Sequence, residues 1–355
     1  MNRLENLLKT AGVGPQDGVL IHKPANIFYL SGYTGEGILA LGRGFRAIVT
    51  DFRYTEQAER QAPGFQVLMV EKGLTHAALA ARLFADHGVT RVLYEDDKVT
   101  VRSFARLQRD IPGVAFASLA NAPEKVRRIK DANELALMEQ ACDISCRAFD
   151  ALLPKIKPGM TEKQLQIILD YTMLEMGADS LAFDTIVASG VNGSLPHAIP
   201  SDKKVAVGEM ITFDFGAKKG GYCADMTRTI SLGNPSPEMK KIYDTVLFAQ
   251  ETCEAMLAPG KCCKDIDAEA RRIIDAAGYA GRFGHGLGHS VGIDIHEDPR
   301  LSPGCDDLLE AGHTITVEPG IYVPGLGGVR IENTCAITPE GGRTLVHAQK
   351  ALLIL

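Results

Sequence analysis

The chain has 355 residues, of which 45% are hydrophobic, and a formal net charge of -6 at pH 7. This length exceeds what one hydrophobic core usually spans, so two domains are expected. The acidic balance provides no basic field, which excludes nucleic acid or an anionic membrane surface as the main partner. Because the N-terminus lacks a signal-peptide pattern and no apolar run reaches about 18 residues, we expect a cytoplasmic protein without membrane spans.

The eight cysteines are scattered along the chain and form no CxxC pair. A disulfide framework or a zinc ribbon would need paired spacings. We therefore interpret them as small buried hydrophobic side chains in a reducing compartment.

Residues 18–120 alternate short apolar runs with helical stretches. The runs predicted to be strands are 18–22, 38–42, 45–51, 65–71, 90–96 and 114–119, with a helix over 75–88. This alternation predicts an α/β layer arrangement. Near Pro123 a charged connector begins and runs into a long helix, so we expect domains of residues 1–124 and 125–355. His22, His76 and His87 are isolated in the first domain, where core or surface roles are expected.

Residues 211–230 contain two aspartates spaced evenly about a glycine-containing turn. A hairpin with Lys219 and Gly220 as its two-residue loop would place Asp214 directly opposite Asp225. Opposed residues lie only about 4.5–5.5 Å apart at Cβ, where like charges destabilise a sheet. The pattern therefore predicts a bound cation, provided that the register does not slip by one residue.

The second domain contains a faint internal repeat. Two segments each read as a helix, a Pro-Gly break at 158–159 or 259–260, and a new helix, and a Gly-rich strand region follows each. The alternative is that Pro-Gly simply breaks helices in any context. A true repeat would place a site at the pseudo-symmetry axis, with residues from both halves.

Further acids and imidazoles fit that expectation. His285, His289 and His296 lie within twelve residues, among glycines that allow close approach of the backbone. Glu318 and Glu332 follow on two apolar strands joined by a Pro- and Gly-rich loop, which predicts a second acidic hairpin. An ionised carboxylate on an apolar strand needs a partner.

Carboxylates combined with imidazole select Mn²⁺, Fe²⁺, Co²⁺ or Zn²⁺ over a thiolate-bound structural zinc. Four negative charges suit two divalent cations, which polarise a carbonyl group and produce hydroxide at neutral pH. The reaction class that follows is hydrolysis. Taken singly, each residue also has a plainer interpretation: a solvent-facing strand acid, a strand end before proline, or a hydrogen-bonded core histidine.

The motifs DFGA…GYCADMTRT, HGLGH…IDIHEDP, TVEPGIY and GVRIENT, in this order, resemble those of the pita-bread metallopeptidases. This group includes aminopeptidase P, prolidase and methionine aminopeptidase. YLSGYTG, TDFRY, RRIKDANELALMEQA and FDTIVASGVNGSLPHAIPSDKKV also resemble the aminopeptidase P and prolidase branch, so the match covers most of the chain. The resemblance implies a creatinase-like α/β N-terminal domain followed by an α+β pita-bread catalytic domain with internal pseudo-two-fold symmetry.

The resemblance also implies roles for particular residues. The family's five metal ligands match Asp214, Asp225, His289, Glu318 and Glu332, with Asp225 and Glu332 as bridges and Glu318 as general base.

Four more residues match family positions near the substrate. His197 and His296 match histidines that hold the scissile peptide and stabilise its tetrahedral intermediate. Arg330 matches an arginine close to the site, and Arg300 one near the free carboxylate of the substrate. Asn333, where many relatives have aspartate, departs from the pattern at a position that is not a ligand, as does Ala198, where glycine is frequent.

The activity implied is that of a dinuclear metal-dependent Xaa-Pro aminopeptidase, an exopeptidase that uses a metal-bridged hydroxide. Three alternatives stay open: a prolidase restricted to Xaa-Pro dipeptides, creatinase-type hydrolysis, whose branch lacks this intact ligand set, and a binding module without catalysis. The expected cofactors are two divalent ions, Mn²⁺ first and Co²⁺, Zn²⁺ or Fe²⁺ as alternatives. The expected partners are short proline-containing peptides and a second copy in a homodimer.

Overall fold

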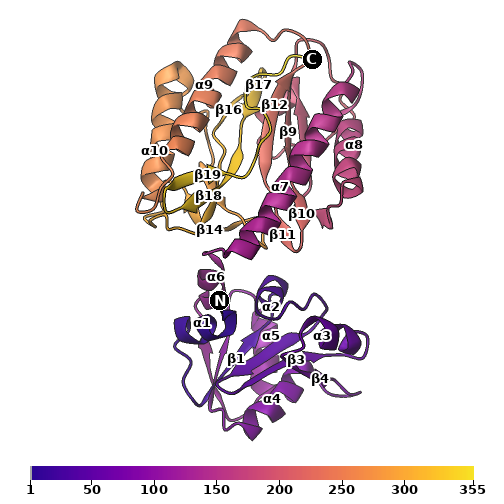
Figure 1. The fold of residues 1–355 in the computed structure, drawn as a ribbon, viewed down its shortest axis with the longest axis vertical. Helices are drawn as coiled ribbons and strands as arrows, with labels where there is room; N and C mark the ends of the chain where they lie inside the picture. The colour runs from indigo at the N-terminus through magenta and orange to yellow at the C-terminus, as the bar shows by residue number, and fades with distance from the viewer. Residues whose placement is uncertain (1) are drawn as a thin grey trace. The chain divides into compact units, whose positions relative to one another are not determined.

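The computed structural model describes residues 2–355, which divide into two compact units, one ending at Arg127 and one beginning at Arg128. Within these residues, no helix combines the length and the apolar run that crossing a membrane requires. Figure 1 shows the helices and strands of both units.

The N-terminal unit is built on one six-stranded sheet of order β4-β3-β2-β1-β5-β6. Its strands are β1 (Asp17–Ile21), β2 (Ile38–Gly42), β3 (Phe45–Thr50), β4 (Gln66–Met69), β5 (Arg91–Tyr94) and β6 (Ala115–Ser118). Its helices are α1 (Arg3–Thr10), α2 (Pro24–Ser31), α3 (Thr55–Gln61), α4 (His76–Asp86), α5 (Val101–Asp110) and α6 (Ala122–Arg127). All six predicted strands and the predicted helix α4 are confirmed. Strand β2 is antiparallel to both neighbours, and the other strands run parallel to one another.

The C-terminal unit, residues 128–355, places helices on both sides of a set of short sheets. Its helices are α7 (Ala132–Leu152), α8 (Glu162–Glu175), α9 (Pro237–Ala255) and α10 (Cys263–Ile274). Its first strands are β7 (Ser180–Leu181), β8 (Ile186–Ser189), β9 (Met210–Phe215), β10 (Ala217–Lys219), β11 (Tyr222–Cys223) and β12 (Met226–Ser231). The later strands are β13 (Gly288–Ser290), β14 (Glu297–Leu301), β15 (Thr314–Val317), β16 (Gly320–Val323), β17 (Gly327–Arg330), β18 (Asn333–Thr338) and β19 (Gly341–Thr344). Figure 1 shows α7 and α8 on one side of these strands and α9 and α10 on the other.

The internal repeat is visible in the backbone hydrogen bonds. Gly159, in the break between α7 and α8, donates its N–H to the carbonyl of Val205 at 2.8 Å. Gly260, in the break between α9 and α10, donates to the carbonyl of Leu309 at 2.7 Å. Both glycines have positive φ angles, 88° and 83°, which side chains disfavour. Each half therefore contributes a helix pair and then a set of strands, as the pseudo-two-fold symmetry predicts.

Aromatic packing decides which face of β9 is buried. The ring centroid of Phe149 on α7 lies 5.7 Å from that of Phe213 and 5.6 Å from that of Phe215. Because side chains alternate along a strand, Asp214 between them points to the opposite face of the sheet. The helix layer thus turns this carboxylate toward the inside of the site.

Candidate metal centre

One cavity of the C-terminal unit, with a volume of about 630 Å³, brings together all of the site residues predicted from the sequence. Its lining includes His197, Asp214, Asp225, His289, His296, Arg300, Glu318, Arg330 and Glu332. The lining also contains apolar side chains that had no predicted role, namely Phe183, Ile186 and Ile295. The lining of the cavity therefore combines charged side chains with apolar ones.

The hairpin that carries the two aspartates has a different register from the predicted one. Asp214 pairs with Thr227, two residues beyond the predicted partner Asp225, and the loop is Gly220-Gly221. The predicted loop of Lys219 and Gly220 was wrong. Both loop glycines have positive φ, 56° and 84°, and a two-residue turn of this kind requires positive φ at both central positions.

A shift of two residues preserves the face on which each side chain lies. Asp225 consequently stays on the same face as Asp214, in the gap between the β10–β11 and β9–β12 segments of the hairpin. Gly216, on the opposite strand, leaves room there, since a Cβ atom on it would lie 1.9 Å from the carbonyl oxygen of Ala224. The predicted shared face is therefore kept, although the predicted direct opposition is lost.

The second acidic hairpin has the same construction. Strands β15 and β18 pair up to Val317 and Asn333, and β16 and β17 pair from Gly320 and Arg330. The β15–β18 and β16–β17 ladders share one register. If this register is continued through the two unpaired positions between the ladders, Glu318 lies opposite Glu332. Asp225 of the first hairpin and both glutamates of the second therefore lie where a ladder is interrupted, whereas Asp214 lies within the β9–β12 ladder.

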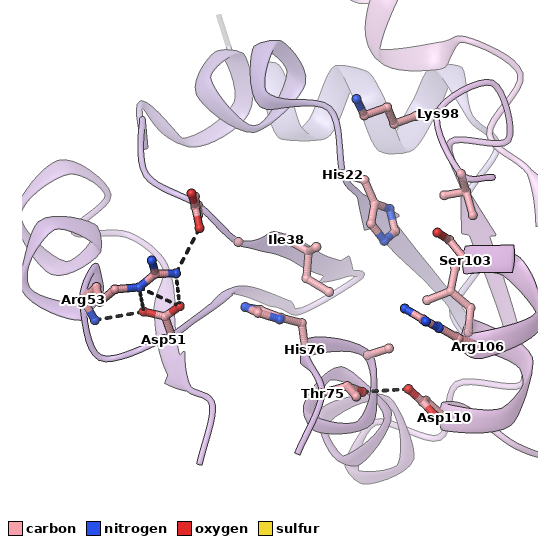
Figure 2. A pocket seen from close by; sticks show the side chains of 15 residues that line it. His22, Ile38, Asp51, Arg53, Thr75, His76, Lys98, Ser103, Arg106 and Asp110 are labelled. Carbon is pink, nitrogen blue, oxygen red and sulfur yellow. Dashed lines mark hydrogen bonds and ion pairs between the residues drawn. The ribbon is translucent and has the colours of Figure 1, made fainter. Parts of the chain in front are cut away.

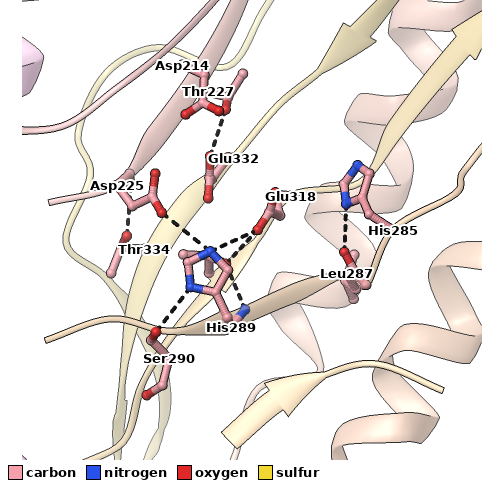
Figure 3. A network of polar contacts seen from close by, with 12 residues as sticks. Asp214, Asp225, Thr227, His285, Leu287, His289, Ser290, Glu318, Glu332 and Thr334 are labelled. Atoms are coloured by element: carbon pink, nitrogen blue, oxygen red, sulfur yellow. Dashed lines mark hydrogen bonds and ion pairs between the residues drawn. The ribbon is translucent and has the colours of Figure 1, made fainter. Parts of the chain in front are cut away.

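His289 lies on β13, with its imidazole oriented by the backbone. Its Nδ1–H donates to the carbonyl of Ser290 at 3.1 Å. Nε2 is therefore unprotonated, and its lone pair faces the carboxylates (Figure 3). Nε2 lies 3.5 Å from Oδ2 of Asp225 and 3.3 Å from Oε1 of Glu318. Burial lowers the pKa of His289 to about 3, so the ring is neutral, as a metal ligand must be.

The carboxylates form a buried cluster of like charge. Burial, together with the neighbouring acids, raises the pKa of Asp225 and of Glu332 well above the ordinary range. Burial also raises the pKa of Glu318 to about 8. Oδ1 of Asp214 and Oε1 of Glu332 are buried and have no hydrogen-bond partner among the described residues.

These observations fit a divalent cation. Ligand atoms of Asp225, His289 and Glu332 lie within 4.8 Å of one another. Two atoms that bind one first-row ion at about 2.1 Å are at most about 4.2 Å apart, a range that includes both distances from Nε2 of His289. A cation there would pair the orphaned oxygen of Glu332 and would offset both the burial and the like-charge repulsion that raise the pKa values of the acids.

Arg330 is buried and fully engaged by protein groups. Its guanidinium donates to Oδ2 of Asp214 at 2.6 Å, to the hydroxyl of Tyr322 at 3.0 Å and to Oγ1 of Thr227 at 3.1 Å. The Tyr322 hydroxyl in turn donates to Nε2 of His285 at 2.8 Å. Thr227 also donates to Oε2 of Glu332 at 2.7 Å. This network orients two of the carboxylates.

Sequence reasoning gave Tyr322 and Thr227 no role. Both lie on strands, Tyr322 on the apolar β16 and Thr227 on the buried β12, where a tyrosine or a threonine is ordinarily interpreted as core. The only signal for Tyr322 was its place in the quoted TVEPGIY motif.

Three predicted residues lie at the exposed rim of the cavity. The side chains of His197, His296 and Arg300 are exposed. The ring of His296 lies 4.4 Å from that of His289, centroid to centroid. Arg300 pairs directly with His289 across the β13–β14 ladder, and the salt-bridge partner of its side chain, Asp298, is 3.9 Å away.

Comparison with known protein families gives two matches. The model of metallopeptidase family M24 matches residues 136–339, and the model of the creatinase/prolidase N-terminal domain matches residues 1–129. A curated Xaa-Pro dipeptidase from Pyrococcus furiosus is 34% identical over 99% of this chain and 99% of its own length.

Solved structures agree with this assignment. The chain matches an Xaa-Pro dipeptidase from Bacillus anthracis with a TM-score of 0.95 and 37% identity, over 99% of both chains. It matches an X-Pro aminopeptidase from Thermotoga maritima with a TM-score of 0.91 and 36% identity, over 98% of this chain and 100% of the other. The chain is therefore a pita-bread metallopeptidase of family M24 with a creatinase-type N-terminal domain, in the branch of proline-specific peptidases.

Proposed function

We propose that this enzyme is a dinuclear Xaa-Pro dipeptidase, which hydrolyses the bond between an N-terminal residue and a C-terminal proline. The observation that carries the proposal is the position of Arg300 beside the metal centre. Residues that pair directly across an antiparallel ladder have Cβ atoms about 4.5–5.5 Å apart, so Arg300 stands next to His289. A cation so close to the ligands suits a carboxylate on the residue that follows the scissile bond.

Five side chains would hold the two divalent cations: Asp214, Asp225, His289, Glu318 and Glu332. Asp225 and Glu332, the two ligands that the family resemblance makes common to both ions, are the most deeply buried of these acids. When bound, such ions polarise a carbonyl group and make water nucleophilic at neutral pH. Mn²⁺ is the proposed occupant, because oxygen-rich ligand sets with one imidazole suit it.

The remaining side chains divide the rest of the chemistry. Glu318 would accept a proton from the attacking water and pass it to the departing proline nitrogen, since its Oε1 lies 3.3 Å from Nε2 of His289, beside the position that the ions would occupy. His197 and His296, on the rim, would donate hydrogen bonds to the carbonyl oxygen as negative charge develops. Phe183, Ile186 and Ile295 would surround the proline ring and exclude water.

We propose a positioning role for Arg330 in place of substrate binding. Its guanidinium is 4% exposed and is already engaged by Asp214, Tyr322 and Thr227. It therefore has little capacity to bind a substrate carboxylate, but it fixes the orientation of Asp214.

Cleavage of longer Xaa-Pro peptides, the activity first expected from the sequence, is the second candidate. Two observations favour it: the cavity volume of about 630 Å³, which exceeds the needs of a dipeptide, and the likeness to the aminopeptidase of Thermotoga maritima. In that case the chain beyond proline would pass Arg300 toward the solvent. We also propose that the protein is a homodimer, whichever of the two activities it has. Sedimentation equilibrium, which measures the molar mass in solution, tests this.

The test is hydrolysis by protein reconstituted with Mn²⁺, using Ala-Pro, Ala-Pro amide and Ala-Pro-Ala. The dipeptidase proposal expects fast hydrolysis of Ala-Pro and slow hydrolysis of the other two, which lack a carboxylate on proline. Arg300→Gln should raise KM for Ala-Pro and leave the amide unaffected, whereas the control Arg272→Gln, at an exposed position of α10, should change neither. Equal rates on Ala-Pro and Ala-Pro-Ala would refute the dipeptidase and favour the aminopeptidase.

A further inference from the structure

Strand β14, which contains Arg300, is interrupted by a bulge. His289 on β13 faces Arg300 across the ladder, whereas the next residue of β13, Ser290, faces Glu297. The two residues between Glu297 and Arg300, Asp298 and a proline, therefore have no partner on β13. Bulges of this kind re-aim the side chains beside them, so the contacts of the bulge influence how Arg300 faces the cavity of the metal centre.

A buried ion pair fixes the first end of the bulge. Nζ of Lys130 lies 3.0 Å from Oε2 of Glu297, and the two side chains are 1% and 6% exposed. Oε1 of Glu297 also accepts the backbone N–H of Asp294 at 3.2 Å. Separating such a pair would leave an uncompensated charge without water, so Glu297 is held in place. Rearrangement of the rim is therefore confined to the residues that follow Glu297.

The carboxylate of Asp298, the first of these residues, lies between two arginines. Its Oδ2 is 3.4 Å from Nη2 of Arg128, and its Oδ1 is 3.9 Å from Nε of Arg300. The side chains of Asp298 and Arg300 are both exposed. Because exposed ion pairs contribute little free energy individually, the loss of one arginine would let Asp298 turn to the other.

A second acid keeps Arg128 within reach of Asp298. Nη1 of Arg128 donates to Oδ2 of Asp307 at 3.0 Å, so one guanidinium bridges two carboxylates. The side chain of Arg128 is half-buried, whereas that of Arg300 is exposed. Arg128 therefore loses less side-chain freedom on pairing, and it is the favoured partner of Asp298, as the shorter distance indicates.

This preference leaves Arg300 available. Among residues 2–355, Asp298 is the only acid within ion-pair distance of Arg300. If Asp298 paired fully with Arg300, the carboxylate of an incoming substrate would have to displace it from the same guanidinium. The ion pair between Arg128 and Asp298 reduces this competition.

We propose that Arg128 sets how tightly the enzyme binds the free carboxylate of its substrate, because it holds Asp298 away from Arg300. Arg128 does not line the cavity of the metal centre, so it is a positioning residue that acts through Asp298. The inference rests on the proposed function, in which Arg300 binds the carboxylate of the residue that follows the scissile bond.

The test is the steady-state kinetics of the full-length, Mn²⁺-loaded enzyme on Ala-Pro and Ala-Pro amide. Arg128→Met should raise KM for Ala-Pro about two- to fivefold, the range that competition from an exposed ion pair gives, and should leave kcat unchanged. The amide, which has no carboxylate, should be unaffected. Adding Asp298→Asn to Arg128→Met removes the competitor and should restore KM, a rescue that a purely structural role of Arg128 would not give.

The N-terminal unit offers a matched control. The guanidinium of Arg53 also lies between two acids, 2.8 Å from Asp51 and 3.1 Å from Glu36 (Figure 2). Arg53 does not line the cavity of the metal centre. Arg53→Met therefore removes a similar bridging arginine and should change KM for neither substrate.

Calorimetry separates binding from catalysis. Chelator-treated protein should bind Ala-Pro without hydrolysing it, and Arg128→Met should lower the affinity by the same factor as it raises KM. Asp298→Asn alone keeps the proposal testable if Arg128→Met folds poorly. This variant should lower KM for Ala-Pro, because a negative charge beside Arg300 is lost.

The outcomes distinguish this inference from the proposed function. An unchanged KM in Arg128→Met, an equal loss on Ala-Pro and its amide, or a raised KM that Asp298→Asn does not restore would overturn the inference alone. A raised KM in the single variant Asp298→Asn would do the same. If Arg300→Gln left KM for Ala-Pro unchanged, the proposed function would fail, and this inference would fail with it.

Discussion

Replacing Glu318 by glutamine should stabilise the metal-free enzyme while it abolishes catalysis. Burial raises the pKa of Glu318 from an ordinary value of 4.5 to about 8. Below pH 4.5 the carboxyl is protonated in the folded and the unfolded chain, so it does not reduce stability. As the pH rises toward 8 the unfolded chain ionises first, and the free energy of unfolding falls.

The magnitude follows from the difference between the two pKa values. One pKa unit corresponds to about 1.4 kcal/mol, so a difference of about 3.5 units gives an upper bound of about 5 kcal/mol. Glutamine cannot ionise and avoids this loss. For a unit of this size about 2–4 °C of melting temperature corresponds to 1 kcal/mol, so the variant should melt roughly 10 °C higher at pH 8.5.

The assay is thermal unfolding of chelator-treated protein at pH 4.5 and pH 8.5, with and without added Mn²⁺. Glu318→Gln should exceed wild type only at pH 8.5 and only without metal, because metal binding stabilises wild type further. Glu340→Gln, the same change at an exposed turn, is the control and should have no effect. A variant that melts below wild type at pH 8.5, or one that gains equally at both pH values, would refute the electrostatic reasoning.

Three further predictions concern the same centre. Chelation should abolish hydrolysis and lower the melting temperature, and Mn²⁺ should restore both; full activity without metal would exclude a metal mechanism. Thr227→Val, which removes the 2.7 Å hydrogen bond to Glu332, should weaken metal affinity about 10- to 100-fold in calorimetry without unfolding the chain. Gly216→Ala should destabilise the unit by about 3 kcal/mol in urea unfolding, because its Cβ would lie 1.9 Å from a backbone oxygen. Gly284→Ala, whose Cβ meets nothing within 4 Å, is the matched control, and equal losses in both variants would disprove the steric argument.

The sheet of the N-terminal unit was predictable because each strand is a short apolar run that polar or turn-forming residues bound. The hairpin register was not, because the prediction followed the even spacing of Asp214 and Asp225. Turn chemistry decides the register: positive φ at both loop positions favours Gly220-Gly221 over a loop that begins with Lys219. The observed register differs from the predicted one by two residues. Because side chains alternate between the two faces of a strand, an even difference leaves both aspartates on the same face.

The residues of the candidate metal centre were predicted mainly from ordered motifs, and only Asp214 and Asp225 were also indicated by their spacing. Their side chains meet because two hairpins from different halves of the unit face one another, which local sequence patterns do not encode. Tyr322 was missed because an isolated tyrosine on an apolar strand is ordinarily a core residue.

The interrupted hairpins have a consequence for how the catalytic unit unfolds. Asp225 belongs to the first half of the unit, whereas His289 and Glu332 belong to the second, so one cation would join segments far apart along the chain. Such a cation acts as a reversible cross-link, because an unfolding chain must either release it or keep a long loop closed. Amide hydrogen exchange in the strands of both hairpins should therefore slow together when metal is added. The metal ion required for hydrolysis would therefore also slow the unfolding of this unit.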